Sequence, residues 1–197
     1  MTRPLESAAP ASVALPEILS TDALTLSRRI YSRELSCHEL MQATLAHLDA
    51  LNPRFNAVVS RIEPELALRQ ARDKDRLLDQ GQWQGWMHGF PQAPKDLTAT
   101  AGLPTTFGSP ALAGNVTAHD SVVVERLRRD GAILIGKTNT PEFGLGSHTY
   151  TPLHGVPGNA YDPTRSAGGS SGGTAVALAL HCLPVADGSD MMGSLRN

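Results

Sequence analysis

Apolar positions recur at helical spacing over residues 36–53, the stretch SCHELMQATLAHLDALNP. Ser36 and Glu39 have the spacing of a capping box at the start of this apolar stripe. Asn52 and Pro53 follow its last apolar position, and a proline usually ends a helix. The pattern predicts an amphipathic helix that begins after Ser36 and stops at Asn52-Pro53.

Two further segments have the pattern of amphipathic helices, residues 21–35 and residues 63–81. In the second segment Pro64 suits a first helical turn, and Gly81 is placed as a C-terminal cap. The charged positions of both segments predict a solvated face rather than a binding surface.

Short apolar runs predict strands between the helices. FNAVV, residues 55–59, is β-branched and apolar, and AILIG, residues 132–136, follows a helix that is predicted to end at Gly131. A helix over about 172–182 precedes LPVA, residues 183–186, which is predicted to be a short strand. This alternation predicts the α/β class.

Residues 85–109 are dense in glycine, proline and threonine, a composition typical of loops, and loops often carry functional residues. Residues 1–20 contain three prolines and Glu6, which interrupt any apolar core of a signal peptide, so a disordered lead-in is predicted there. Residues 21–197 contain no internal repeat or linker and are predicted to belong to a single domain.

Composition narrows the class of function. Seventeen basic and nineteen acidic residues give a net charge of -2 without a long run of one sign, so neither a nucleic-acid nor a membrane partner is predicted. The apolar run 175–186 is shorter than the roughly 20 residues of a membrane span. Cys37 and Cys182 lack disulfide-framework or metal-ligand spacing, which indicates a reducing cytoplasm.

The stretch SAGGSSGGTAVALAL, residues 166–180, places four glycines around Ser170 and Ser171. A flexible linker is improbable because an apolar segment follows at once. A phosphate-binding nest is disfavoured because no lysine follows the glycines, as the P-loop pattern requires. The third interpretation, a serine hydroxyl held in a cleft, needs a base. That base can be a lysine whose burial lowers its pKa from about 10.4, which points to Lys95, or a histidine. The available histidines include His88, His148, His154 and His181.

Four blocks of sequence together resemble the amidase signature family in order and spacing. They are HGFPQAPKDLTATAGLPTTFGS, GKTNTPEFG, AYDPTRSAGGSSGGTAVALAL and DGSDMMGSLRN. The resemblance covers residues 21–197. It implies a mixed β-sheet core with helices on both faces, and hydrolysis of a small carboxamide to a carboxylate and ammonia or an amine. It implies neither a cofactor nor a metal.

The resemblance also implies a catalytic set. Lys95 in PKDL matches the lysine of the family, Ser170 its cis-peptide serine, and Ser194 in MMGSLR its nucleophile. Taken singly, Lys95 is also explained as a surface cation, Ser170 as a turn or cap residue and Ser194 as a loop serine. Together they predict proton transfer from Ser194 through Ser170 to Lys95, and an acyl-enzyme on Ser194. The predicted oxyanion hole consists of backbone N–H groups of Met191, Met192 and Gly193.

Two features depart from the family pattern. Where the commonest form has two glycines before the nucleophile, this chain has Met192-Gly193, a change that main-chain donors tolerate. In a second interpretation the methionines shape the acyl pocket. Family domains are usually more than twice as long, so residues 21–197 are expected to be the N-terminal part of one. The isolated chain is then expected to fold poorly and to show negligible activity.

Two alternative functions stay open. One is the A subunit of glutamyl-tRNA amidotransferase, which feeds ammonia to partner subunits; Met191-Met192 and FPQAP before Lys95 argue mildly against it. The other is an inactive truncated amidase fragment, including one that survives only with a partner. The sequence does not define the amide substrate, and a homo-oligomer of the full-length protein is compatible with it.

Overall fold

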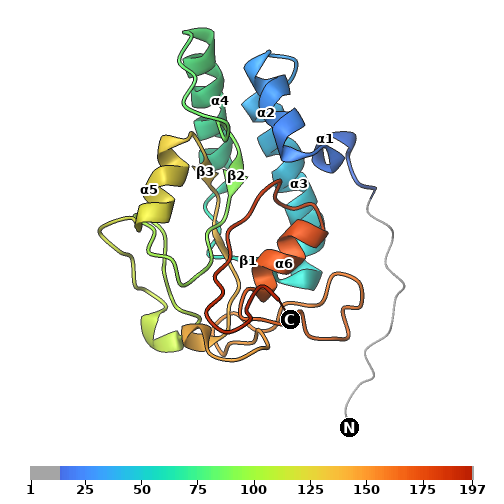
Figure 1. The fold of residues 1–197 in the computed structure, drawn as a ribbon, viewed down its shortest axis with the longest axis vertical. Helices are drawn as coiled ribbons and strands as arrows, with labels where there is room; N and C mark the ends of the chain where they lie inside the picture. The colour runs from blue at the N-terminus through green and yellow to red at the C-terminus, as the bar shows by residue number, and fades with distance from the viewer. Residues whose placement is uncertain (1–13, 197) are drawn as a thin grey trace.

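The structure, a computed structural model, describes residues 14–196 (Figure 1). Helices α2 and α4 lie at the top of Figure 1, α3 runs downward from α2 to the level of α6, and the C-terminal end of the chain lies near α6. The elements in chain order are α1 (Glu17–Ser20), α2 (Ala23–Tyr31), α3 (Cys37–Phe55), β1 (Val58–Val59), α4 (Pro64–Asp79), β2 (Pro91–Gln92), the 3-10 turn η1 (Pro110–Leu112), α5 (Val122–Arg129), β3 (Ile133–Leu134), β4 (Lys137–Thr138), the 3-10 turn η2 (Glu142–Gly144) and α6 (Gly172–Ala179).

Local sequence signals are confirmed at the ends of two helices. Ser36 and Glu39 form the predicted capping box at the start of α3, each side chain bonding the backbone N–H of the other residue. Pro64 opens α4, and Gly81 follows its end with a φ of +75°. These signals are confirmed because each acts within a few residues of the helix end.

The predicted stop of α3 is wrong by two residues. The helix runs to Phe55 with Pro53 inside its last turn, so the predicted strand 55–59 is reduced to Val58–Val59. Asn56 then ends the helix in the left-handed conformation, and its N–H donates to Asn52 O at 2.7 Å. Pro53 costs the helix one bond, because it has no N–H to donate to the carbonyl oxygen of Asp49 four residues earlier.

The strands form two pairs, one parallel and one antiparallel, and a parallel bridge between Lys95 and Thr138 connects them into the predicted mixed arrangement. β2 runs parallel to β3, with Pro91 opposite Ile133, and β1 runs antiparallel to β4, with Val58 opposite Thr138. The parallel pair is connected through α5, as expected for a β–α–β unit. The fold is therefore mixed α/β, and the apolar run AILIG contributes β3 to its centre.

Helices pack against these strands. α4 contacts β3, and α6 contacts both β1 and β4. The start of α6 is close to the sheet, because a Cβ at Gly173 would lie 2.3 Å from Asn139 N and 2.6 Å from Ala57 O. Only glycine permits that approach. The resulting core includes the fully buried Phe90 and Ile135.

Two other predictions about secondary structure need correction. Residues 183–186 form no strand, because Pro184 has no N–H to donate and Val185 O accepts from the Gln92 side chain at 2.7 Å. The loop-rich segment 85–109 contains β2, which its composition does not indicate.

At the N-terminus, residues 1–13 of the predicted lead-in lie outside the described residues. Glu17–Ser20 form one helical turn, α1, with Leu19 buried, so the expected disorder does not extend to these residues. Within residues 14–196 no helix combines the length and the apolar character required to cross a bilayer.

Candidate active site

Lys95 lies just beyond β2, where backbone bonds to β4 fix it on both sides. Thr138 N donates to Pro94 O at 3.0 Å, and Asp96 N donates to Thr138 O at 3.1 Å. The parallel pairing of β2 thereby continues to Lys95. The sheet places the start of this side chain at a defined point, as a catalytic group requires.

The Lys95 side chain is 1% exposed and ends among three serine hydroxyls. Its Nζ donates to Ser170 Oγ at 2.8 Å, to Ser171 Oγ at 3.0 Å and to Ser189 Oγ at 2.9 Å. An ammonium has three donors, so these bonds account for all of them.

The protonation of Lys95 is shifted toward the neutral form. Burial lowers the pKa of Lys95 to about 8, although the carboxylates of Asp187 and Asp190 act in the opposite direction. Burial also raises the pKa of Asp187, whose carboxylate accepts from Lys95 N at 3.3 Å. A lysine in this state can act as a base near neutral pH.

Ser170 connects the buried lysine to the surface. The Gly169–Ser170 peptide bond is cis, and Ser170 O accepts from Thr140 Oγ1 at 3.1 Å. Ser170 Oγ donates to Ser194 Oγ at 2.9 Å. Ser170 is 3% exposed while Ser194 is only partly buried, so the chain of hydroxyls leads from the interior to the surface.

The glycines next to Ser170 make room for Thr149. A Cβ at Gly172 would lie 2.3 Å from Thr149 Oγ1, which accepts from Gly172 N at 3.2 Å. The loop therefore needs a residue without a side chain at this point, which explains why glycines surround the two serines.

A cavity of about 550 Å³ opens over Ser170 and Ser194. Met191, Met192 and Gly193 also line it. A larger hollow of about 670 Å³ lies among α2 residues and two tryptophans, and its lining contains none of the residues of the hydroxyl relay. We therefore regard the smaller cavity as the candidate active site, because the reactive groups open into it.

The turn before Ser194 is built around Asp190. Its carboxylate accepts from Gly193 N at 2.6 Å and from Arg196 Nε at 2.8 Å. The hydrogen bond from Arg196 holds the pKa of Asp190 well below its usual range. Of the three amides predicted for the oxyanion hole, that of Gly193 thus points at Asp190, whereas Met191 and Met192 lie at the cavity.

Sequence reasoning misses two partners of Lys95 and a third group beside it. It interprets Ser171 only as a turn or cap residue, and it singles out neither Ser189 nor Asp187. Ser189 lies 94 positions from Lys95, so no local spacing indicates the contact. The only available signal is that Ser189 belongs to the block DGSDMMGSLRN, which also contains Ser194.

The histidines considered as bases lie elsewhere. His88 is buried beside α4, where its Nε2 bonds Lys74 O at 2.9 Å, and burial lowers its pKa. His154 Nε2 lies 3.6 Å from Asp96 Oδ2. Among residues 14–196 no group of three His, Cys, Asp or Glu side chains could hold a metal ion.

Comparison with known proteins gives consistent matches. The profile of the family described as Amidase matches residues 39–197. The chain is 42% identical over 174 residues to an acylamidase of Rhodococcus erythropolis, covering 88% of this chain and 36% of that protein. It is 41% identical over 172 residues to the A subunit of glutamyl-tRNA(Gln) amidotransferase from Picosynechococcus sp., covering 87% of this chain and 35% of that protein.

Solved structures agree. A crystal structure of an amidase superposes with a TM-score of 0.82 at 37% identity, covering 89% of this chain and 40% of that one. The native peptide amidase of Stenotrophomonas maltophilia superposes with a TM-score of 0.77 at 35% identity, covering 84% and 35%. The chain thus spans between a third and two fifths of the length of these relatives.

Proposed function

The chain belongs to the amidase family, and on that premise we propose that it supplies the catalytic residues of an amide hydrolase. The reaction converts a carboxamide to a carboxylate and ammonia or an amine through an acyl-enzyme on Ser194. The observation that carries the proposal is the relay from buried Lys95 through Ser170 to Ser194, with distances of 2.8 Å and 2.9 Å, at the edge of a cavity.

The direction of the hydrogen bonds fits a protonated resting form. In that form Lys95 donates to Ser170 and Ser170 donates to Ser194. Loss of one proton from Lys95 lets both bonds reverse, so that Ser194 donates to Ser170 and Ser170 donates to Lys95. The Ser194 oxygen is then activated for attack on the carbonyl carbon of the amide.

Both halves of the reaction use the same relay. When Ser194 Oγ attacks, its proton passes to Ser170 as the Ser170 proton passes to Lys95. Collapse of the tetrahedral intermediate breaks the C–N bond, and Ser170 gives a proton to the leaving nitrogen as Lys95 returns one to Ser170. Water then attacks the ester and gives a proton to Ser170 as Ser170 passes its own to Lys95. The acid leaves and ionises to the carboxylate, while Ser194 recovers its hydroxyl proton from Ser170 and Ser170 recovers one from Lys95.

The oxyanion that forms during attack needs donors. We propose the backbone N–H groups of Met191 and Met192, which lie in the turn organised by Asp190. Gly193 N–H joins them only if it leaves Asp190. Each donor of this kind is worth about 3 kcal/mol of transition-state stabilisation in related chemistry.

The test uses the protein as its native source makes it. Its intact mass is measured first, because the chain spans 36% of the length of the acylamidase relative. The protein is then treated with a fluorophosphonate, which labels activated serines, and digested for mass spectrometry. We expect the adduct on Ser194 and its loss in Ser194→Ala. An adduct on Ser170, or no adduct in a protein that hydrolyses amides, contradicts the assignment.

A second candidate function has support from the relatives. The identity to the amidotransferase relative is nearly as high as that to the acylamidase, 41% against 42%. Release of ammonia from a simple carboxamide by the purified protein alone favours the hydrolase. Release that needs added partner subunits and glutamine favours a role in an amidotransferase.

A further inference from the structure

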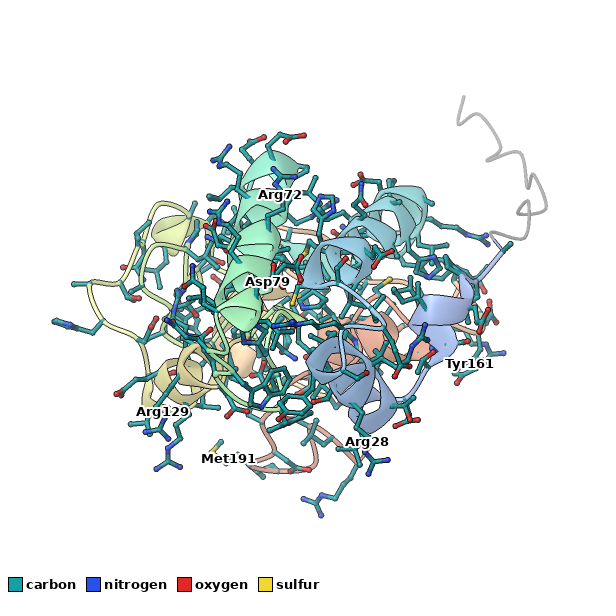
Figure 2. All side chains as sticks on the ribbon, turned by 90° about the horizontal axis from the view of Figure 1, so that it is seen from above. Arg28, Arg72, Asp79, Arg129, Tyr161 and Met191 are labelled. Atoms are coloured by element: carbon teal, nitrogen blue, oxygen red, sulfur yellow. The ribbon has the colours of Figure 1, made fainter. Side chains whose placement is uncertain are left out.

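The cavity over Ser194 has an apolar wall. The side chains of Leu97, Phe143, Leu145, Met191 and Met192 line it, and its other lining residues are glycines and serines. Met191 and Met192 are 86% and 89% exposed, and Figure 2 shows Met191 at the outer edge of the molecule. Apolar surface left open beside a reactive group is typical of a ligand-binding site.

Part of this wall is fixed before any ligand arrives. Phe143 N donates to Phe107 O at 2.7 Å, and Gly144 N donates to Pro141 O at 2.8 Å. A Cβ at Gly144 would lie 2.6 Å from Leu97 Cδ1, so the turn is pressed against that side chain. Binding here needs little reordering of the backbone, which favours affinity.

The charged groups near the cavity are turned toward other partners. Glu142, beside Phe143, accepts from Ser109 Oγ at 2.6 Å. Asp190 is paired with Arg196. The ammonium of Lys95 lies behind Ser170 and is almost completely buried. None of the described residues that line the cavity is charged, so a charged ligand would lose hydration there without gaining a counter-charge.

We propose that this wall binds the acyl part of the substrate and selects carboxamides whose acyl group is apolar and uncharged. The inference rests on the proposed hydrolase function and adds the class of substrate to it. The cavity, about 550 Å³, falls within the range of small-molecule sites, so it accepts an acyl chain of several carbons or an aromatic ring. Substrates that carry a carboxylate or an ammonium on the acyl group are disfavoured, glutamine among them.

Two amides of equal chain length test the selection. Hexanamide and adipamate differ only in the carboxylate at the far end of the chain. With the native protein, we expect kcat/KM for ammonia release to be about 100-fold higher for hexanamide, because the site cannot compensate the charge. Comparable values for the two amides overturn the inference and leave the hydrolase proposal intact. Absence of hydrolysis of hexanamide, adipamate and acetamide overturns both.

Variants locate the selecting residues. Phe143→Ala should lower the ratio of kcat/KM for hexanamide over acetamide about tenfold. Met192→Lys should raise kcat/KM for adipamate relative to hexanamide, because it supplies the missing counter-charge. Tyr161→Ala is the matched control, since Tyr161 is 90% exposed and lies well apart from Met191 (Figure 2). If Phe143→Ala and Tyr161→Ala give the same ratios as the unaltered protein, another stretch of chain covers the wall and the inference is wrong.

Discussion

Lys95 and Lys137 are two buried lysines on segments that meet at the bridge between Lys95 and Thr138, and burial lowers the pKa of each to about 8. Their surroundings differ. Lys95 donates to three serine hydroxyls, one of which continues to Ser194 at the cavity. Lys137 donates to the carbonyl oxygen of Thr98 and to Thr100 Oγ1, and the Asp96 carboxylate lies nearby.

The difference shows what a shifted pKa does and does not indicate. The Thr100 hydroxyl beside Lys137 donates to the Thr98 carbonyl oxygen at 2.9 Å, and that oxygen has no proton to give. Lys137 is therefore held as a donor and joins the loop at Thr98 to β4. A serine hydroxyl both accepts and donates, so Lys95 can exchange a proton through Ser170. The groups around a lysine, and their access to a cavity, therefore distinguish a base from a structural cation.

The largest expected effect separates the two lysines. Lys95→Met should lower kcat by at least about 1,000-fold while the melting temperature holds or rises, because the hydroxyls of its serine partners can bond one another or water. Lys137→Met should lower the free energy of unfolding by about 3 kcal/mol, since the buried Thr98 carbonyl oxygen and Thr100 hydroxyl lose their charged donor. Turnover assays and thermal melts of both variants provide the measurement. Equal losses of turnover per folded molecule would remove the distinction.

A smaller effect is expected from Asp187, whose carboxylate raises the pKa of both lysines. In the proposed mechanism the neutral form of Lys95 is the active one, so kcat/KM should rise with pH through about 8. Asp187→Asn removes a carboxylate that stabilises the ammonium, so the rise should move to lower pH. At pH 6.5 we expect kcat/KM, as a fraction of its own plateau, to increase about threefold.

The control for this variant is Asp120→Asn. Asp120 raises the pKa of Lys137 and is paired with Arg128. Its removal should leave the pH profile of kcat/KM in place. A profile that moves equally in both variants would show that the field of the whole site, rather than Asp187, sets the protonation of Lys95.

The smallest effects come from single hydroxyl partners. Ser171→Ala removes one of the three acceptors of Lys95 and should lower kcat a few-fold, because the lysine is less well positioned. Thr100→Val removes one acceptor of Lys137 and should lower the free energy of unfolding by about 1 kcal/mol with little change in kcat. Urea unfolding and steady-state kinetics distinguish the two outcomes. A loss of turnover in Thr100→Val together with a loss of stability alone in Ser171→Ala would contradict the comparison.

Much of the local structure could be predicted from short-range signals. The capping box of Ser36 and Glu39, the proline that opens α4, and the glycine that follows its end were all readable, because the bonds involved join residues a few positions apart. The α/β class followed from the alternation of apolar patterns, and the mixed sheet from the resemblance to the family. The blocks around Lys95, Ser170 and Ser194 indicated the family.

Other features depended on contacts between distant segments. Strand β2 arises where the chain after Phe90 pairs with β3, and Pro91 gives no strand signal of its own. In the segment 183–186 the Val185 carbonyl oxygen accepts from the Gln92 side chain instead of from a neighbouring backbone, so no strand forms. Pro53 was expected to end α3, but the turn at Asn56 ends it instead.

The sequence by itself determined the family, the start of α3 and both ends of α4, and it pointed to Lys95, Ser170 and Ser194 as candidate catalytic residues. Only the tertiary structure decided that Ser171 and Ser189 join Ser170 around Lys95, that Gly193 N–H points at Asp190, and that the wall of the cavity is apolar. The reason is physical. Local bonds are encoded by neighbouring residues, whereas the environment of a buried lysine depends on how segments some 90 positions apart in sequence pack together.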